Sequence, residues 1–236
     1  MNPFDIDECL RFGWDAVGRR PAYLVGVTVL VGVLSFVPQS MLRGLVSANP
    51  AIALLAEMVI FAASILLAVG TNAFYLKAHD DLATSRMSDL WHPQAFGPFL
   101  RVVLLFVAIS IPFLIAVAVL AGIAGAIWEN HSSIAVFLIF TAFSAFCAML
   151  VFMTRFMFAP LLVVDRTIGA VDAMKESARL VDGRMGKFAL LVLVVGMLNI
   201  LGLLFFVVGI LVTAPMSRLA WTHAYRLATA PEQTAA

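Results

Sequence analysis

The chain has 236 residues, of which 63% are hydrophobic and 12% are charged, and its formal net charge is +1. Soluble domains carry about a quarter charged residues, so this composition excludes a soluble globular protein and predicts an all-α integral membrane protein. The charge gives no basis for nucleic-acid binding. Because one span needs about 20 apolar residues, about five or six spans take up most of the chain. We therefore predict a single polytopic membrane domain, residues 1–236, with no room for a separate soluble domain.

The N-terminal segment, residues 4–20, has the pattern of an amphipathic helix, which is predicted to lie in the membrane interface. Its apolar face consists of Ile6, Leu10, Trp14 and Val17. Acidic rather than basic residues precede the first apolar run, which argues against a cleavable signal peptide and keeps the N-terminus in the cytoplasm. Cys9 is then cytoplasmic and Cys147 lies within a span, so no structural disulfide is expected.

The apolar runs predict about six spans. These cover approximately residues 21–37, 51–76, 99–127, 134–158, 188–202 and 204–225. In the third span, Ala118, Gly122 and Ala126 form a row of small residues that is suited to close helix packing.

The apolar run that begins at Phe188 has two interpretations. One tilted span would leave the C-terminus outside, whereas a hairpin that turns near Asn199 and Gly202 would return it to the cytoplasm. Six spans place fourteen of the fifteen Lys and Arg residues inside, and five spans place twelve inside. The positive-inside rule therefore favours six spans with both termini in the cytoplasm.

The segment from Arg155 to Lys187 holds six of the fifteen basic residues and is predicted to be the main cytoplasmic loop. Within it, residues 168–182 predict a second interfacial helix, which is either a spacer or a site for anionic lipid headgroups or a partner. Thr167 is suited to cap its first turn, and Gly183 to close its last turn in the left-handed conformation. The expected apolar face consists of Val171, Met174, Ala178 and Val181.

A weak internal repeat indicates three helical hairpins that each begin at the cytoplasmic interface. Gly18, Arg19 and Arg20 before the first span resemble Gly183, Arg184 and Lys187 before the fifth, and Gly97, Pro98 and Arg101 form a looser third copy. Chance similarity between apolar strings is the alternative interpretation.

Polar side chains inside the spans are the candidate functional residues, because a charge is costly in hydrocarbon. The candidate intramembrane polar site consists of Glu57, Asn72, Arg155 and Asn199. Glu57 is expected either to pair with Arg43 or to form a proton or cation site. Arg155 is expected to extend to the interface, and the two asparagines are expected to form interhelical hydrogen bonds.

The sequence contains no phosphate-binding loop and no nucleophile elbow. His79, Asp80, Asp81 and His92 share one cytoplasmic loop, but they lack the close spacing of a metal site. We therefore predict no catalytic residue, no metal ligand and no cofactor.

Two stretches carry a resemblance to other proteins: FAPLLVVDRTIGAVDAMKESARLVDGRMGKFALL and GLLFFVVGILVTAPMSRLAWTHAYRLA. The resembling positions include Pro160, Asp165, Arg166, Lys175, Ser177 and Gly183 in the loop, and Gly209, Pro215 and Tyr225 in the last span. They are similar to a loose superfamily of bacterial polytopic membrane proteins that includes the membrane domain fused to some glycerophosphodiester phosphodiesterases. The resemblance implies a six-span fold in the bacterial plasma (inner) membrane. The phosphodiesterase domain has no counterpart here, so its activity is not implied.

Two functions are consistent with these patterns. The first is a non-enzymatic module that binds lipid or a membrane-protein partner through its interfacial helices. The alternative is a small transporter with Glu57 in its path.

Overall fold

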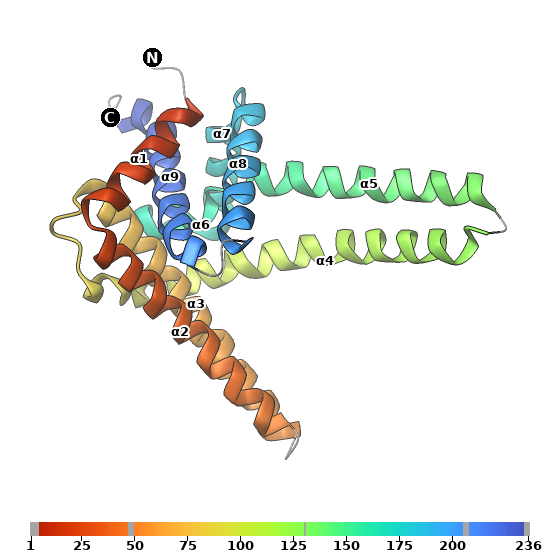
Figure 1. Ribbon diagram of the computed structural model, residues 1–236, viewed down its shortest axis with the longest axis horizontal. Helices are drawn as coiled ribbons and strands as arrows, with labels where there is room; N and C mark the ends of the chain where they lie inside the picture. The colour runs from red at the N-terminus through yellow and green to blue at the C-terminus, as the bar shows by residue number, and fades with distance from the viewer. Residues whose placement is uncertain (1–4, 47–49, 130, 205–207, 234–236) are drawn as a thin grey trace.

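The computed structural model describes residues 5–46, 50–129, 131–204 and 208–233, and the regular elements in these ranges are all helical (Figure 1). This confirms the all-α fold. The α-helices are α1 (Ile6–Arg19), α2 (Pro21–Val46), α3 (Pro50–Asp80), α4 (Phe96–Ile127), α5 (Ser132–Arg155), α6 (Ala159–Arg166), α7 (Ala170–Val181), α8 (Met185–Leu204) and α9 (Val208–Gln233). Two short 3-10 helices, η1 (Met87–Leu90) and η2 (Pro93–Ala95), connect α3 to α4.

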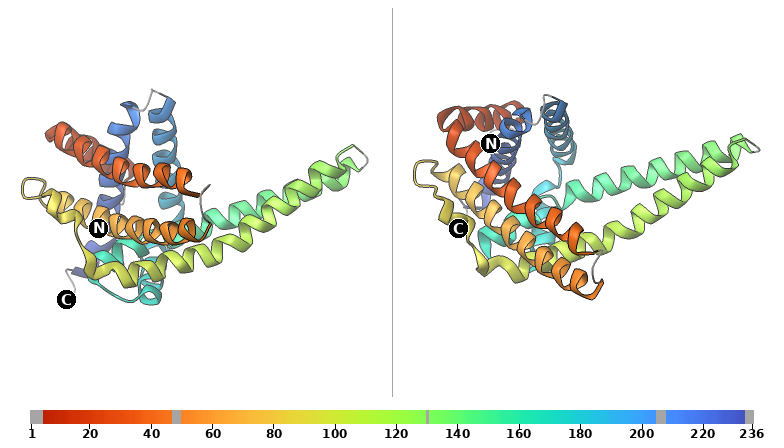
Figure 2. Two further views of the ribbon diagram at one scale, coloured as in Figure 1. Left: turned by 90° about the horizontal axis from the view of Figure 1, so that it is seen from below. Right: turned by 60° about the horizontal axis from the view of Figure 1, so that its bottom comes forward.

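The long helices pair as three hairpins, α2 with α3, α4 with α5, and α8 with α9. Figures 1 and 2 show that these hairpins extend in different directions from a common region, which also contains α1, α6 and α7 and which we call the base. The predicted division into hairpins therefore appears in the fold.

Five helical segments among the described residues are long and apolar enough to cross a membrane. They are Pro21–Met41, Ala51–Asp80, Met87–Ile127, Ser132–Arg166 and Met185–Leu204. The sixth predicted span corresponds to α9, which is not among them and which carries Arg218, His223 and Arg226. A membrane-spanning character is thus supported for five segments.

Helix α8 ends at Leu204 and α9 begins at Val208, so the break falls a few residues after the predicted turn near Asn199 and Gly202, and both of these residues lie within α8. The Asn199 amide donates to the carbonyl of Val195 and to Ser217 Oγ of α9, so it links the two helices of the hairpin. Gly202 lies against Gly209: a Cβ added at Gly209 would collide with the backbone of Gly202, and one added at Gly202 would collide with the hydroxyl of Thr213. These polar and small residues therefore serve helix packing, not chain reversal.

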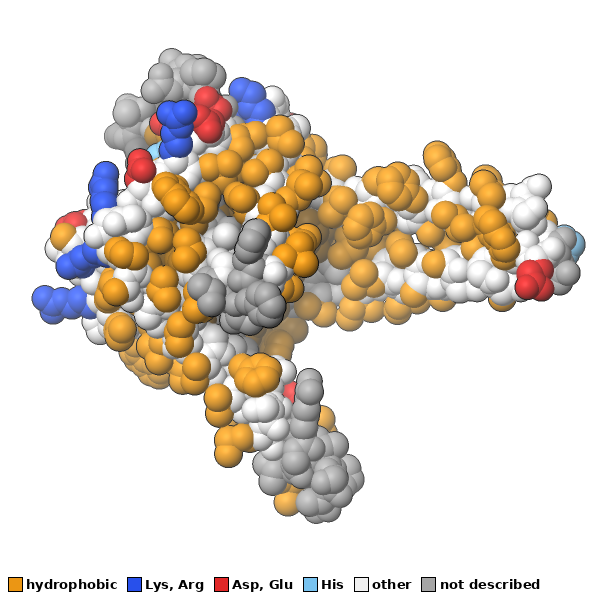
Figure 3. Space-filling model, in the orientation of Figure 1, with side chains coloured by type: hydrophobic (Ala, Val, Ile, Leu, Met, Phe, Trp, Pro, Cys, Tyr) orange, Lys and Arg blue, Asp and Glu red, His pale blue; other side chains and the backbone are white. Residues whose placement is uncertain are grey.

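The buried core lies in the base, where the three hairpins meet. Helix α6 is at its centre, since Leu161, Leu162, Val163 and Val164 are all buried and therefore contact neighbours on every side of the helix. The largest fully buried side chains come from several hairpins and include Leu24, Phe74, Phe158, Phe188, Leu219 and Tyr225. In Figure 3 the Lys and Arg side chains on the visible face gather over the base, whereas apolar side chains cover the hairpins.

Helix α7 matches the predicted amphipathic helix in place, and its packed face overlaps the predicted one only in part: Val181 is buried and Met174 packs against the core, whereas Val171 is exposed. The face that contacts the base consists of Ala170, Ala173, Ser177, Leu180 and Val181. Val171 is 57% exposed, because the small side chains on the neighbouring stripe allow closer packing. Thr167 is not the N-cap: with φ of 51° it terminates α6, and Gly169 precedes α7. The left-handed conformation of Gly183 is confirmed by its φ of 71°.

Helix α1 packs along α9 (Figure 1). Its N-cap is Asp5, whose carboxylate accepts a hydrogen bond of 3.1 Å from the backbone N–H of Asp7. The buried side includes Cys9, Gly13 and Val17, whereas Trp14, assigned to the apolar face in the sequence, is exposed. A Cβ added at Gly13 would lie 2.5 Å from the carbonyl oxygen of Met216, so glycine is needed for this close approach.

Gly13→Ala is expected to separate α1 from α9, whereas Gly18→Ala on the same helix is the matched control because a Cβ there meets nothing within 4 Å. Gly18→Ala should stabilise the protein by up to about 1 kcal/mol through helix propensity, and Gly13→Ala should lower the melting temperature.

Maleimide labelling of Cys9 provides a second measurement of this docking. Burial, together with Glu8 and Asp5, raises the pKa of the Cys9 thiol to about 12. Cys9 should therefore stay unlabelled near neutral pH in the wild type and in Gly18→Ala, and become reactive in Gly13→Ala. Equal labelling in the two variants would contradict the docking of α1.

Candidate functional site

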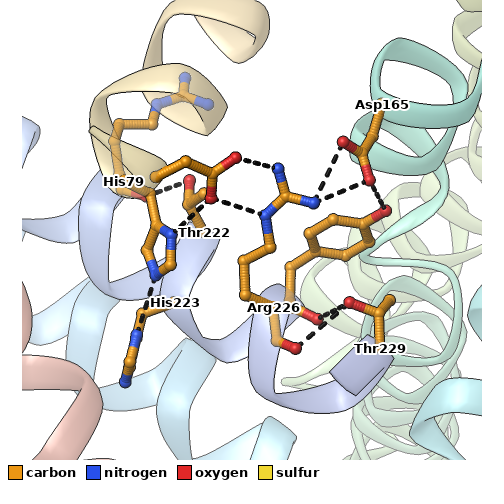
Figure 4. A network of polar contacts seen from close by, with 9 residues as sticks. His79, Asp165, Thr222, His223, Arg226 and Thr229 are labelled. Atoms are coloured by element: carbon orange, nitrogen blue, oxygen red, sulfur yellow. Dashed lines mark hydrogen bonds and ion pairs between the residues drawn. The ribbon is translucent and has the colours of Figure 1, made fainter. Parts of the chain in front are cut away.

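A network of polar side chains joins the hairpins in the base, and Arg226 of α9 is at its centre (Figure 4). Its guanidinium donates to Asp80 at the end of α3 over 2.5 and 3.1 Å, and to Asp165 in the last turn of α6 over 3.1 and 3.2 Å. The planar guanidinium presents two edges, which allows this paired contact with two carboxylates. One side chain thus joins three elements that are distant in the sequence.

The surroundings of Arg226 are partly removed from solvent. The side chains of Arg226 and Asp165 are 20% and 19% exposed, and that of Asp80 is 51% exposed. Burial alone would lower the pKa of Arg226, but Asp165 and Asp80 outweigh this effect and raise it. The guanidinium therefore remains charged, and with two carboxylates the cluster has a formal excess of one negative charge.

Tyr225 completes the contact with α6. Its hydroxyl donates a hydrogen bond of 2.7 Å to Asp165 Oδ2, and its ring is fully buried against Phe158, at 5.7 Å between ring centroids. Asp165 and Tyr225 come from the two separate stretches that carry the resemblance. The fold brings these two stretches into direct contact.

On the other side of Asp80, two histidines extend the network. His79 Nδ1 lies 3.0 Å from Asp80 Oδ1, and His79 Nε2 lies 3.0 Å from His223 Nδ1. A neutral imidazole has one donor and one acceptor, so donation from His79 to Asp80 leaves His223 Nδ1 as the donor to His79. Phe12 of α1 stacks on His223 at 4.3 Å with an interplanar angle of 7°. The histidine pair therefore also contacts α1.

Two polar clefts lie beside this network, and Asp80 lines both of them. One, of about 410 Å³, is lined also by Lys77, Asp89, Trp91 and Arg226. The other, of about 480 Å³, has among its lining residues Phe12, Arg19, Arg20 and His79. Both clefts contain side chains of opposite charge, which suits a small polar group that carries both signs. Among the described residues, no group of three or more His, Cys, Asp or Glu is placed to hold a metal ion.

The four candidates of the intramembrane polar site lie apart from this network. Glu57 is exposed on α3, and the side chain of Arg43, its proposed partner, lies outside the described residues. The Asn72 amide donates to the carbonyl of Ala68 in its own helix, and Arg155 is exposed at the end of α5. In the described part of the chain, no hydrogen bond joins any two of the four.

The resembling residues of the loop are mostly structural. Pro160 lies in the first turn of α6, where its missing N–H costs nothing. The buried Ser177 hydroxyl accepts from the N–H of Phe158 and donates to the carbonyl of Arg155, which fixes α7 against the end of α5. Arg166 contacts Glu176 of α7 at 3.5 Å, and Lys175 is exposed.

In the last helix, Gly209 permits the close crossing of α8 and α9, and Pro215 is buried within α9.

Neither Arg226 nor His223 was among the residues predicted from the sequence to be functional, and His79 and Asp80 were considered there only as metal ligands. The available signal was a group of polar residues in α9, in which Arg226 follows Thr222 by four residues and His223 by three, and Thr229 follows Arg226 by three. That spacing places a polar stripe on a mostly apolar helix, but it does not identify partners in α3 or α6.

Arg226→Gln is expected to lower the unfolding free energy by about 3 kcal/mol, because it leaves the largely buried carboxylate of Asp165 and the more exposed one of Asp80 without their cation. Arg218→Gln is the control, since Arg218 is exposed on the same helix and its replacement should change stability by less than about 0.5 kcal/mol. The measurement is chemical unfolding of the purified protein in detergent, followed by circular dichroism.

Asp165→Asn and the double variant complete a thermodynamic cycle with Arg226→Gln. We expect a coupling energy above about 1 kcal/mol between the two positions. If the effects of the two substitutions on stability were additive, this would contradict a direct interaction between Arg226 and Asp165.

No protein family model, curated protein or solved structure matches the chain.

Proposed function

We propose that the protein is a non-enzymatic membrane module that binds lipid or a membrane-protein partner. The observation that carries the proposal is a difference in burial: the core of the base is buried, whereas most residues of the candidate spans are not. Only 6–17% of the residues in an 18-residue stretch of each candidate span are buried within the chain. The spans therefore present most of their apolar side chains to whatever surrounds them.

In a bilayer this arrangement is stable without further protein contacts, because lipid tails are as apolar as leucine side chains. The α4–α5 hairpin is an example, with Leu114, Ile115, Phe137 and Phe140 all exposed. Such surfaces are available to acyl chains or to the helices of another membrane protein. The base, held by buried apolar side chains and by Arg226, would fix the positions of these surfaces.

The polar network also favours binding over catalysis. His79 hydrogen-bonds to Asp80 and to His223, and Arg226 is occupied by two carboxylates. These contacts are those of a structural network. They do not present an activated nucleophile beside a base, which covalent hydrolysis would require.

The resemblance to the bacterial superfamily is part of the same proposal. Its residues supply the contact between Tyr225 and Asp165 and the crossing at Gly209, so they account for the architecture and leave the ligand open.

The proposed function is tested on the protein extracted from membranes in a mild non-ionic detergent and analysed by native mass spectrometry. We expect the chain to carry phospholipid or a second protein at a fixed stoichiometry. The chain alone, free of both, would contradict the proposal.

Reconstituted vesicles provide a further control for the transporter alternative. A pH gradient that the wild type dissipates, and Glu57→Gln does not, would also overturn the proposal and favour transport.

We further propose six spans in the bacterial plasma membrane, with both termini in the cytoplasm. The hairpin of α8 and α9 supports this, because it returns the chain to the base, where α1 packs on α9. The base also contains Arg19, Arg20 and Lys77, as expected for the cytoplasmic side.

Reporter fusions after Ala236 test this orientation. A cytoplasmic reporter such as a fluorescent protein is expected to be active there, and alkaline phosphatase is expected to be inactive. Fusions within the loop that contains Arg86 serve as an internal reference for the cytoplasmic side. Active phosphatase at the C-terminus would leave five spans.

A further inference from the structure

An apolar groove of about 470 Å³ lies along the α2–α3 hairpin. Helix α2 contributes Leu30, Leu34 and Pro38, which follow one another at intervals of four residues and therefore share one helix face. From Leu30 to Pro38 this face extends about 12 Å at 1.5 Å per residue. The groove is thus long and narrow, and its volume is in the range of ligand pockets, about 300–1,000 Å³.

Small residues on α3 create the hollow. Ala63 and Ser64 face the groove, where larger side chains would fill the space between the two helices. Its walls are otherwise almost entirely apolar, so water would find few hydrogen-bonding partners inside. Because both helices are candidate spans, the groove opens into the hydrocarbon of the bilayer, where acyl chains are the abundant apolar molecules.

One end of the groove is marked by Trp91, which follows η1 and is 69% exposed. Trp91 also lines the polar cleft beside Arg226, so this side chain borders both the apolar groove and the cleft. Indole rings favour the boundary between hydrocarbon and headgroups. An amphipathic molecule would therefore fit with its apolar part in the groove and its polar part in the cleft.

The charges of the cleft define the polar part. Lys77 and Asp89 form an ion pair of 2.8 Å, and the pairs of Arg226 with Asp80 and Asp165 lie in the same lining. Two cations and three carboxylates face the space, so an anionic headgroup would meet a formal excess of negative charge. A headgroup with both a phosphate and an ammonium group fits this lining better, because its phosphate would face Lys77, whose side chain is 45% exposed beside Asp89, and its ammonium group would face the carboxylates.

We propose that the α2–α3 groove binds one acyl chain of a zwitterionic phospholipid, whose headgroup lies in the cleft beside Trp91 and Lys77. This inference rests on the proposed function as a lipid-binding module and names the ligand class and its site. The site would make the lipid a structural part of the junction between the first hairpin and the base.

The experiment compares Ala63→Phe, which fills the groove, with Ala62→Phe, which places the same side chain on the neighbouring, equally exposed position of α3 outside the groove. Delipidated proteins are titrated in non-ionic detergent with phosphatidylethanolamine or with phosphatidylglycerol of the same acyl chains, and bound lipid is counted by native mass spectrometry. We expect one phosphatidylethanolamine per chain in the wild type and in Ala62→Phe, and at least tenfold weaker binding in Ala63→Phe.

Each of the other possible results would overturn a specific part of the proposal. Unchanged binding in Ala63→Phe, or equal loss in both variants, would remove the groove and leave general lipid binding intact. Tighter binding of phosphatidylglycerol would overturn the zwitterionic headgroup. A wild type that retains neither lipid would reject the groove together with the lipid-binding half of the proposed function. If Ala63→Phe does not fold, Trp91→Ala takes its place with the same expected loss, because Trp91 is exposed and its removal should spare the core.

Discussion

The bridge from Arg226 to Asp80 and Asp165 is the contact on which the arrangement of the hairpins depends. A guanidinium that is largely removed from solvent must have its charge balanced and its N–H groups paired. The fold meets this requirement with one carboxylate from the first hairpin and one from α6, the helix that connects the second hairpin to the third. The orientation of α9 is therefore tied to both, and Tyr225 reinforces the contact with α6.

This constraint explains why stability is concentrated in the base. The buried apolar side chains of α6, together with Phe74, Phe158 and Phe188, form the core of the base, and they leave the polar network only partly open to solvent. In the α2–α3 and α4–α5 hairpins, the paired helix is the principal contact of each helix. Bilayer lipid can then replace protein as the packing partner of the spans without loss of apolar contact. A rigid base with exposed spans is the physical basis of the binding function that we propose.

The lipid site that we infer connects these two parts of the molecule. Its groove belongs to a span hairpin, and its cleft is lined by the same Asp80 and Arg226 that hold the base together. A headgroup in the cleft would compete with, or extend, the existing ion pairs. Lipid binding and the position of the first hairpin would consequently be coupled through Asp80.

Composition and the lengths of the apolar runs determined that the protein is an all-α membrane protein, because hydropathy and helix length are local properties of the chain. A local rule also predicted the left-handed Gly183. The bridge was decided only by the tertiary structure, since Arg226 lies 146 residues from Asp80 and 61 from Asp165. The rotation of α7, which buries Ala173 and Ser177 and leaves Val171 exposed, was likewise beyond the sequence pattern. Periodicity identifies an apolar stripe, but the fit of Ala173 and Ser177 against the base determines which stripe is buried.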